Sequence, residues 1–436
     1  MPDTIIIGGG VAGLAAAAAL GGTGHTVKVF ETRPFLGGRA TSYSAPGSDE
    51  VIDNCQHILL KCCVNLRDFY TRIGVADQIE FHRKFYFIEP GGRTSTLEAG
   101  VLPSPAHFTE SFLKGTYLSL ADKLSLARGL LALKREYKKR TDLDQITMLE
   151  WLREKHQTPR AIERFWRQVL VSAINEELDR MAASHGFQVF WLGFLTNRDS
   201  YEMGIPSIPL GELYREAVWK RFPSVTIEAR QPVDHLVFEN GRVAGVQTAT
   251  ALHHADHYIA AVPFDRIGAL LPEIDATPFT HVPITGIHLW FDRPITDLPH
   301  ATLLDRTIHW MYNKHEGRYV QLVVSASRSL TPMARGEVIA LALKELAEFF
   351  PLVKEAKLEK AHVVKEVRAT FSAAPGLESK RPLTQTKIPN LFLAGDWTRS
   401  GWPSTMEGAA RSGYKAAEAV TQAAGMPRQF LLPDTA

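Results

Sequence analysis

Three glycines near the N-terminus have a spacing that suits the binding of phosphate groups. Gly8, Gly10 and Gly13 form the pattern Gly-x-Gly-x-x-Gly directly after three consecutive isoleucines. Gly8 permits a tight turn, Gly10 lets a pyrophosphate approach the backbone, and Gly13 lets a helix pack closely on a strand. The N–H groups at the start of such a helix carry partial positive charge that attracts phosphate. The pattern indicates a dinucleotide site, which also includes Ala12.

The sequence around these glycines predicts the elements that such a turn must connect. Residues 4–7 are rich in β-branched side chains and predict a buried parallel strand, and the alanine-rich residues 15–20 predict a helix. A second strand over residues 26–30 ends at Glu31, about 20 positions into the unit, where a carboxylate accepts hydrogen bonds from an adenosine ribose. These elements together favour nucleotide binding over a glycine turn without a ligand.

The composition narrows the class of protein. The chain has 436 residues, of which 45% are hydrophobic and 22% charged, as is typical of a globular protein with two domains. The net charge of +2 gives no reason to expect a nucleic acid partner. The spacing of Cys55, Cys62 and Cys63 fits no zinc site, so we expect no metal and a reducing compartment.

The sequence contains no segment that predicts a membrane span or a signal peptide, which would need about 18 apolar residues or a charged segment before an apolar run. We therefore expect a cytoplasmic protein. Residues 118–133 are rich in leucine and directly precede the basic residues 134–140. They predict either peripheral contact with an anionic membrane, on its inner face, or a solvated helix end.

A second glycine pair, Gly37 and Gly38, follows the acidic residue and leads into Arg39 and Ala40. A plain nicotinamide site does not need this pair. The pair suits a loop that passes close to a second stretch of the same dinucleotide, with Arg39 reaching phosphate; the alternative is an ordinary turn with a surface arginine. With this signature the sequence resembles the superfamily of FAD-dependent amine oxidases and phytoene desaturases.

The resemblance implies an α/β fold with a Rossmann-like FAD-binding domain, similar to that of glutathione reductase, and a discontinuous α+β substrate domain rich in helices. The FAD-binding domain would comprise residues 1–90, 206–275 and 385–425. The substrate domain would comprise residues 91–205, which form a mainly helical cap, and residues 276–384, which mix sheet and helix.

The last signature lies near the C-terminus, where a buried strand ends at Gly395 and Asp396 and a helix begins at Met406 after Thr405. The resemblance implies that Asp396 binds the ribitol of a non-covalent FAD and that the helix N-terminus points at the flavin. Its partial positive charge would favour the anionic reduced flavin. The resemblance also implies that the backbone at Val233 meets the adenine.

Polar residues alternate with apolar ones in the segment 51–60, which in this superfamily runs along the flavin into the substrate cavity. Asp53, Gln56 and His57 could orient a substrate or donate a proton. The alternative is a buried polar cluster that is satisfied by its own hydrogen bonds.

Four aromatic residues share one predicted helix face, which is typical of a core and would also suit a pocket for a long hydrocarbon. They are Phe187, Phe190, Trp191 and Phe194.

Within the superfamily the sequence is most similar to the squalene-associated FAD-dependent desaturases, the hydroxysqualene dehydroxylases. The similarity is carried by residues 53–57, 165–176, 206–210 and 395–408, with Cys55 as a departure, since many relatives have glycine there. It implies reduction of a C30 isoprenoid alcohol to squalene with loss of water, for hopanoids or related lipids, with Asp53 and His57 as candidate acids. Only one dinucleotide fingerprint is present, so the reductant of FAD is an unidentified external donor.

Three other functions remain open at this point. A carotenoid desaturase of the phytoene type would use the same fold and an equally apolar cavity. A flavin amine oxidase usually has an aromatic residue directly before Met-Glu-Gly, where this chain has Thr405. Rab escort and GDP-dissociation-inhibitor proteins resemble this fold without binding flavin, and the presence of Glu31, Arg39 and Asp396 disfavours that function.

Overall fold

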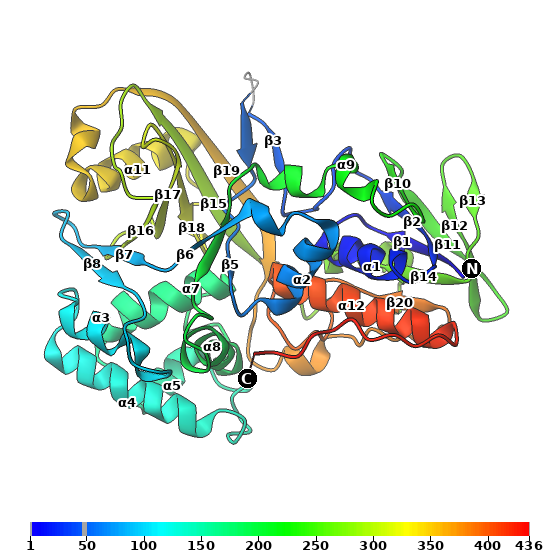
Figure 1. Cartoon of the computed structure of the whole chain (residues 1–436), viewed down its shortest axis with the longest axis horizontal. Helices are drawn as coiled ribbons and strands as arrows, with labels where there is room; N and C mark the ends of the chain where they lie inside the picture. The colour runs from blue at the N-terminus through cyan, green and yellow to red at the C-terminus, as the bar shows by residue number, and fades with distance from the viewer. Residues whose placement is uncertain (1, 46–49, 436) are drawn as a thin grey trace.

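A five-stranded parallel sheet forms one end of the molecule (Figure 1). The computed structural model describes residues 2–45 and 50–435. The strand order is β10-β2-β1-β14-β20, and every neighbouring pair is parallel. The strands are β1 (Asp3–Ile7), β2 (Thr26–Glu31), β10 (Val225–Ala229), β14 (His257–Ala260) and β20 (Leu391–Leu393). Three separate parts of the chain thus build one sheet, and the predicted α/β fold with a Rossmann-like sheet is confirmed.

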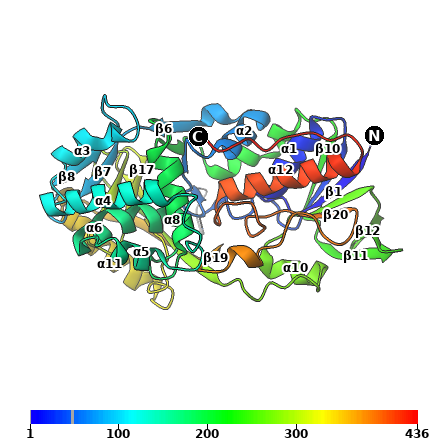
Figure 2. The same ribbon diagram turned by 90° about the horizontal axis from the view of Figure 1, so that it is seen from below.

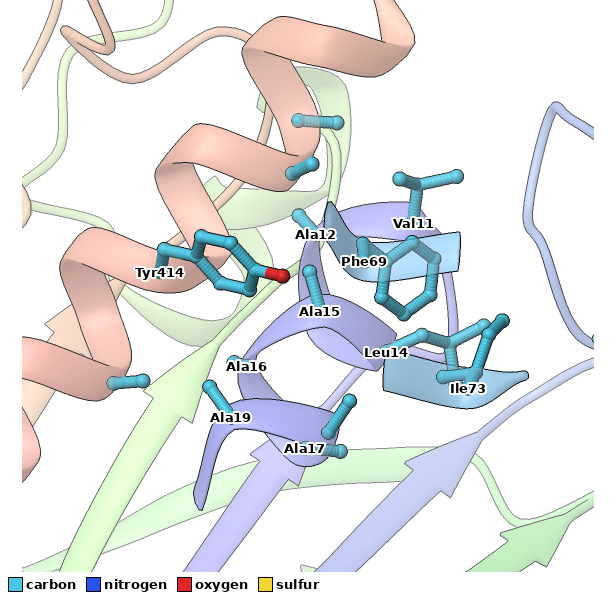
Figure 3. Close-up of a cluster of buried hydrophobic side chains, with 14 of the residues drawn as sticks. Val11, Ala12, Leu14, Ala15, Ala16, Ala17, Ala19, Phe69, Ile73 and Tyr414 are labelled. Atoms are coloured by element: carbon cyan, nitrogen blue, oxygen red, sulfur yellow. The ribbon is translucent and has the colours of Figure 1, made fainter. Parts of the chain in front are cut away.

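Two helices from opposite ends of the chain cover this sheet side by side, α1 (Val11–Gly21) and α12 (Met406–Ala423). Figure 3 shows Tyr414 of α12 beside the alanines of α1, and Phe69 and Ile73 of α2 (Val64–Ile73) beside Leu14. The backbones approach so closely that a Cβ on Gly413 would lie 2.2 Å from the carbonyl oxygen of Ala12. Small side chains on both helices permit this contact, which explains the alanine-rich sequence of α1.

A second sheet has seven strands, in the order β19-β15-β18-β17-β16-β7-β8. It is antiparallel except for the pairing of β16 with β7. Helix α11 (Arg335–Phe349) packs on one face, and the other face contacts the helical cap. The strands are β7 (Phe85–Ile88), β8 (Thr94–Leu97), β15 (His281–Phe291), β16 (His300–Leu303), β17 (Trp310–His315), β18 (Tyr319–Val324) and β19 (Leu358–Phe371).

The helical cap lies at the end of the molecule opposite α1 and α12 (Figure 2). Capping boxes fix two of its helix starts, where Ser119 pairs with Asp122 and Thr147 with Glu150. Helices and helical turns make up most of residues 106–195. The helices are α3 (Thr109–Lys114), α4 (Leu120–Glu136), α5 (Met148–Glu154), α6 (Pro159–Ala161), α7 (Gln168–Ile174) and α8 (Ala183–Phe190), with π-helical turns η3 (Ile162–Arg167) and η4 (Trp191–Leu195).

Short elements connect these layers. The small sheets contain β3 (Ser42–Ser44) and β4 (Val51–Asp53); β5 (Leu59–Leu60), β6 (Ile79–His82) and β9 (Met203–Pro206); and β11 (Val233–Glu239), β12 (Arg242–Thr248) and β13 (Leu252–His253). The remaining helices are η1 (Ala76–Gln78), η2 (Ala106–Phe108), η5 (Leu210–Tyr214), α9 (Glu216–Trp219), α10 (Phe264–Leu270), η6 (Pro351–Lys354) and η7 (Glu378–Lys380). The turn between β11 and β12 has positive φ at Asn240 and Gly241.

The structure changes one boundary expected from the sequence. The segment 81–89 is divided between β6 and β7, which belong to different sheets. The predicted domain boundary at residue 90 therefore falls inside the hairpin of β7 and β8, and the hairpin pairs with β16 of the second sheet.

No helix in the described part of the chain combines the length and apolar character that a membrane crossing requires.

Candidate active site

The glycine turn between β1 and α1 has a shape that leaves room for a ligand. Gly8 has a φ of +113°, and a Cβ there would lie 2.6 Å from the carbonyl oxygen of Ala261. A Cβ on Gly13 would lie 2.0 Å from the carbonyl oxygen of Gly8, so helix and strand are in close contact at this point. For a Cβ added to Gly10, the nearest atom is the Cα of Gly38, 4.0 Å away. Gly10 therefore faces open space at the N-terminus of α1, as a pyrophosphate site requires.

The loop with the second glycine pair lies against this turn. The Gly37 N–H donates to the carbonyl oxygen of Gly9 at 2.9 Å. Gly38 has a φ of +65°, and a Cβ on it would lie 3.1 Å from the Cα of Gly10. Only glycine fits so close to another backbone, which explains the pair in physical terms.

The Glu31 carboxylate is fixed at the end of β2 by two backbone N–H groups. Gly9 and Arg33 each donate to one of its oxygens at 2.7 Å. A carboxylate has further lone pairs, so these bonds leave acceptor capacity for ribose hydroxyls.

Arg39 and Asp396, which are 357 residues apart, form an ion pair. The Arg39 Nη2 lies 2.6 Å from Asp396 Oδ1, its Nη1 donates to the Ala369 carbonyl at 2.8 Å, and the Ser404 hydroxyl donates to the other Asp396 oxygen. Burial alone would raise the pKa of Asp396, but the Arg39 charge and these hydrogen bonds hold it below its ordinary value. The sequence predicts phosphate as the partner of Arg39; here the guanidinium binds Asp396 and a backbone carbonyl.

The N-terminus of α12 completes this cleft. Thr405 caps the helix through its hydroxyl, which accepts from the Gly408 N–H at 3.0 Å. Met406 follows, and both residues line the cleft. The partial positive charge of the helix start therefore points toward whatever occupies it.

A single cleft of about 660 Å³ brings the predicted cofactor residues together. Gly13 is the exception, because it packs against Gly8 instead. The lining residues among those predicted are Gly8, Gly10, Ala12, Glu31, Gly38, Arg39, Ala40, Val233, Gly395, Asp396, Thr405 and Met406. The sequence interpretation missed further lining residues outside the three signatures, among them Asn175, Arg266, Glu366, Ala369 and Thr370. Asn175 follows α7, and no short motif marks the other four, because α10 and β19 bring them to the cleft only in the folded chain.

The two candidate acids have different surroundings. Asp53 is buried and accepts hydrogen bonds from Ser42, the Leu210 N–H and Lys314. Burial would raise the pKa of Asp53, but the Lys314 charge and these bonds lower it overall. Asp53 is thus an ionised group that joins three segments, and this geometry gives no support to a role as proton donor.

His57 lines the cleft, and its Nδ1 lies 2.8 Å from the Cys55 carbonyl oxygen. A carbonyl only accepts, so Nδ1 carries a proton, and in the neutral ring Nε2 is an acceptor. Burial lowers the pKa of His57. The ring therefore donates a proton through Nε2 only in its cationic form.

An apolar cavity of about 160 Å³ adjoins the cleft. Its walls come from the second sheet, from α7, α8 and η4, and from the start of α12. Among the described residues, the only charged side chain in these walls is Glu407, whose carboxylate accepts from Asn65 and from the Leu66 N–H at the start of α2. The residues common to cleft and cavity are Ile58, Ser172, Ala173, Thr405 and Met406.

Only part of the predicted aromatic face reaches this cavity. Phe187 and Phe190 are fully buried in the cap, and Trp191 stacks on Tyr137 with ring centroids 4.6 Å apart. Phe194 lines the cavity from the π-helical turn η4. The wider turn of a π-helix shifts the side chains that follow it, so the four residues do not share one role.

A comparison with known protein families identifies the chain. The model of the family "Flavin containing amine oxidoreductase" matches residues 11–421. The chain belongs to this family. Its cofactor is FAD, and the open space at Gly10 and the cleft described above fit that dinucleotide. The protein is thus an FAD-dependent oxidoreductase.

Two curated relatives and one solved structure are similar over most of the chain. A probable zeta-carotene desaturase of Synechococcus elongatus is 26% identical over 96% of this chain and 98% of its own length. A 15-cis-phytoene desaturase of the same organism is 26% identical over 95% of each chain. An oxidoreductase of Methanosarcina mazei superposes with a TM-score of 0.71 at 19% identity and covers 94% of this chain and 98% of its own. The last likeness supports the fold alone.

Proposed function

We propose that the protein acts on a long isoprenoid and reduces hydroxysqualene to squalene with loss of water, as in hopanoid synthesis. The observation that carries this proposal is the apolar cavity that joins the nucleotide cleft at Ser172 and Thr405. A long hydrocarbon chain is stabilised by leaving water for such a cavity. Glu407, the one carboxylate that the described residues contribute to its walls, already caps α2, which disfavours an amine substrate.

The proposed reaction needs one hydride and one proton. FAD, once reduced by an external donor, supplies the hydride when bound. The C–O bond of the substrate breaks, its carbon takes the hydride, and its oxygen takes the proton and leaves as water. His57 is the proposed proton donor, because it faces the cleft beside the cavity. The low pKa of His57 means that its cationic fraction increases as the pH falls below 6.5.

Anaerobic mixing of photoreduced holoenzyme with hydroxysqualene is expected to give squalene and reoxidised flavin in a single turnover. We expect His57→Gln to slow this step by about 100-fold or more, since general acid catalysis contributes about 10²- to 10⁴-fold. The variant should also lose the rise in rate toward low pH. Flavin that stays reduced, with no squalene formed by the wild type, would refute the proposal.

A carotenoid desaturase is the second candidate, because the two curated relatives carry that activity in their names. Its substrate would be a hydrocarbon, and the flavin would accept electrons instead of supplying them. Incubation of the oxidised holoenzyme with phytoene and analysis of the products by mass spectrometry separates the two. A C30 isoprenoid alcohol extracted from the purified protein would favour hydroxysqualene.

We further propose that the cap contacts an anionic membrane surface beside the cavity. Six exposed apolar side chains on α3, α4 and the loop before them make up the proposed patch: Val101, Leu102, Leu113, Leu120, Leu124 and Leu131, which are 45–86% exposed. Lys114, which is exposed and pairs with Glu110, and Lys123, which is half-buried, lie on the same helices. The loop begins after Leu97, which lines the cavity. Apolar side chains beside lysines are typical of a surface that binds anionic lipid.

The double variant Leu113→Ser and Leu120→Ser is expected to bind vesicles of phosphatidylglycerol at least about 10-fold more weakly in co-sedimentation. The reason is that full burial of each leucine contributes about 1.5–3 kcal/mol. The matched control is Leu352→Ser with Leu383→Ser, two leucines that are 47% and 59% exposed outside the patch. Equal losses in both double variants would contradict membrane contact through this patch.

A further inference from the structure

Two polar groups in the walls of the apolar cavity have no hydrogen-bond partner among the described residues. They are the amide oxygen of Gln168 and the hydroxyl of Thr302, whose residues are 3% and 0% exposed. Buried polar atoms in folded proteins nearly always have a partner, because burial without one costs free energy. Their place in a cavity wall means that a ligand can supply the missing partner.

The other polar side chains of these walls are bonded within the protein. Ser172 accepts from the Trp310 Nε1 and donates to the Gln168 carbonyl, both at 2.7 Å. Gln188 donates to the Gly401 carbonyl at 2.8 Å, Thr405 accepts from the Gly408 N–H, and Glu407 accepts from Asn65 and Leu66. The unpaired groups at Gln168 and Thr302 are therefore not a general feature of this cavity.

Gln168 and Thr302 lie on elements that are tied together. Thr302 on β16 is paired in register with Trp310 of β17. Gln168 begins α7 after the π-helical turn η3. The bonds from Trp310 to Ser172 and from Ser172 to the Gln168 carbonyl connect the sheet to this helix. Both unpaired groups thus lie on elements that hydrogen bonds connect, and π-helical turns occur frequently at functional sites.

The position of Gln168 along α7 relates it to the cleft. Ser172 lines both the cleft and the cavity, and Gln168 lies four residues earlier, on the same helix face. Four residues of an α-helix advance about 6 Å. Gln168 therefore lies about one helical turn into the cavity from its junction with the cofactor cleft.

We propose that Gln168 and Thr302 bind the single hydroxyl group of a long isoprenoid alcohol and select it over the corresponding hydrocarbon. This inference rests on the proposed function, whose substrate class it defines. An alcohol donates one hydrogen bond and accepts up to two; its O–H donates to the Gln168 oxygen while one lone pair of its oxygen accepts from the Thr302 O–H. A hydrocarbon leaves both protein groups unpaired, and a site of this kind discriminates strongly against such an analogue.

The test compares the dissociation constants of hydroxysqualene and squalene for the oxidised holoenzyme in detergent, measured by quenching of tryptophan fluorescence. Oxidised flavin carries no hydride, so binding is separated from turnover. We expect the wild type to prefer the alcohol. Gln168→Leu and Thr302→Val should each weaken alcohol binding by about 10-fold, as loss of one hydrogen bond does, with little change for squalene. An unchanged preference in both variants would overturn the inference.

Matched controls separate recognition from stability. The hydroxyl of Thr4 is also buried without a partner, but it lies in β1 outside cleft and cavity, so Thr4→Val should leave the preference unchanged. Gln188→Leu changes a glutamine of the same cavity whose amide already has a partner, and it should affect both ligands equally. Flavin content and melting temperature verify that each variant is folded, and Thr302→Val preserves the side-chain shape.

The two proposals can fail separately. If hydroxysqualene is not reduced but the variants still lose their preference for the alcohol, the hydroxyl site stands and the proposed reaction is wrong. If hydroxysqualene is reduced and the variants keep the wild-type preference, the reaction stands and Gln168 and Thr302 do not recognise the hydroxyl.

Discussion

Gly10→Ala is expected to give a folded protein that retains less FAD than the wild type. The added Cβ meets no protein atom closer than the Gly38 Cα at 4.0 Å, and the φ of −77° at Gly10 suits alanine, so the fold itself tolerates the change. The same methyl group occupies the space where a pyrophosphate approaches the start of α1. Overpacking of this kind costs about 1–3 kcal/mol, which corresponds to about 5- to 150-fold in affinity.

The measurement is the ratio of flavin absorbance to protein after gel filtration, together with the melting temperature of the apoprotein. Gly13→Ala is the contrasting variant, because its Cβ would lie 2.0 Å from the Gly8 carbonyl oxygen and should destabilise the apoprotein as well. Gly268→Ala is the neutral control, since no atom lies within 4 Å of the added Cβ. Full flavin retention by Gly10→Ala would show that the dinucleotide does not pass this glycine.

The nucleotide-binding half of the molecule follows from short stretches of sequence, because close backbone contacts there demand particular residue types. Gly8, Gly13 and Gly38 each lie where a Cβ would meet other backbone atoms within about 3 Å, and such positions are visible as glycine motifs. The alanines of α1 are similarly explained by the close approach of α12. Local spacing therefore carries enough information to place the cleft.

The substrate half depends on contacts that no local pattern encodes. Gln168 and Thr302 have ordinary neighbours in the sequence, and only the pairing of β16 with β17 and the bond from Trp310 to Ser172 bring them to one wall. For Asp53, the local sequence suggests a role that its surroundings in the folded chain do not support. Its polar surroundings in the sequence suggest catalysis, whereas Lys314, a distant residue in the chain, neutralises it in the folded state.

Asp396→Ala is expected to lower stability and flavin content together. The substitution removes the partner of Arg39 and the acceptor of the Ser404 hydroxyl. Loss of one member of a buried pair costs about 3–5 kcal/mol, and we expect the lower end because the Arg39 side chain is 33% exposed. For a chain of this size that corresponds to a decrease of about 3 °C in the melting temperature of the apoprotein.

Asp396→Asn separates charge from hydrogen bonding, because the amide oxygen can still accept from Ser404. The pKa of Asp396 is lower in the folded protein than the ordinary value of 3.8. Its stabilising contribution is therefore present above that value and is lost as the pH falls through the folded pKa. Below about pH 4, the melting temperature of Asp396→Asn should decrease less steeply than that of the wild type, whereas the exposed control Asp77→Asn should follow the wild type. Identical acid profiles for Asp396→Asn and the wild type would mean that the ion pair with Arg39 contributes nothing to the fold, and that Asp396 serves the cofactor alone.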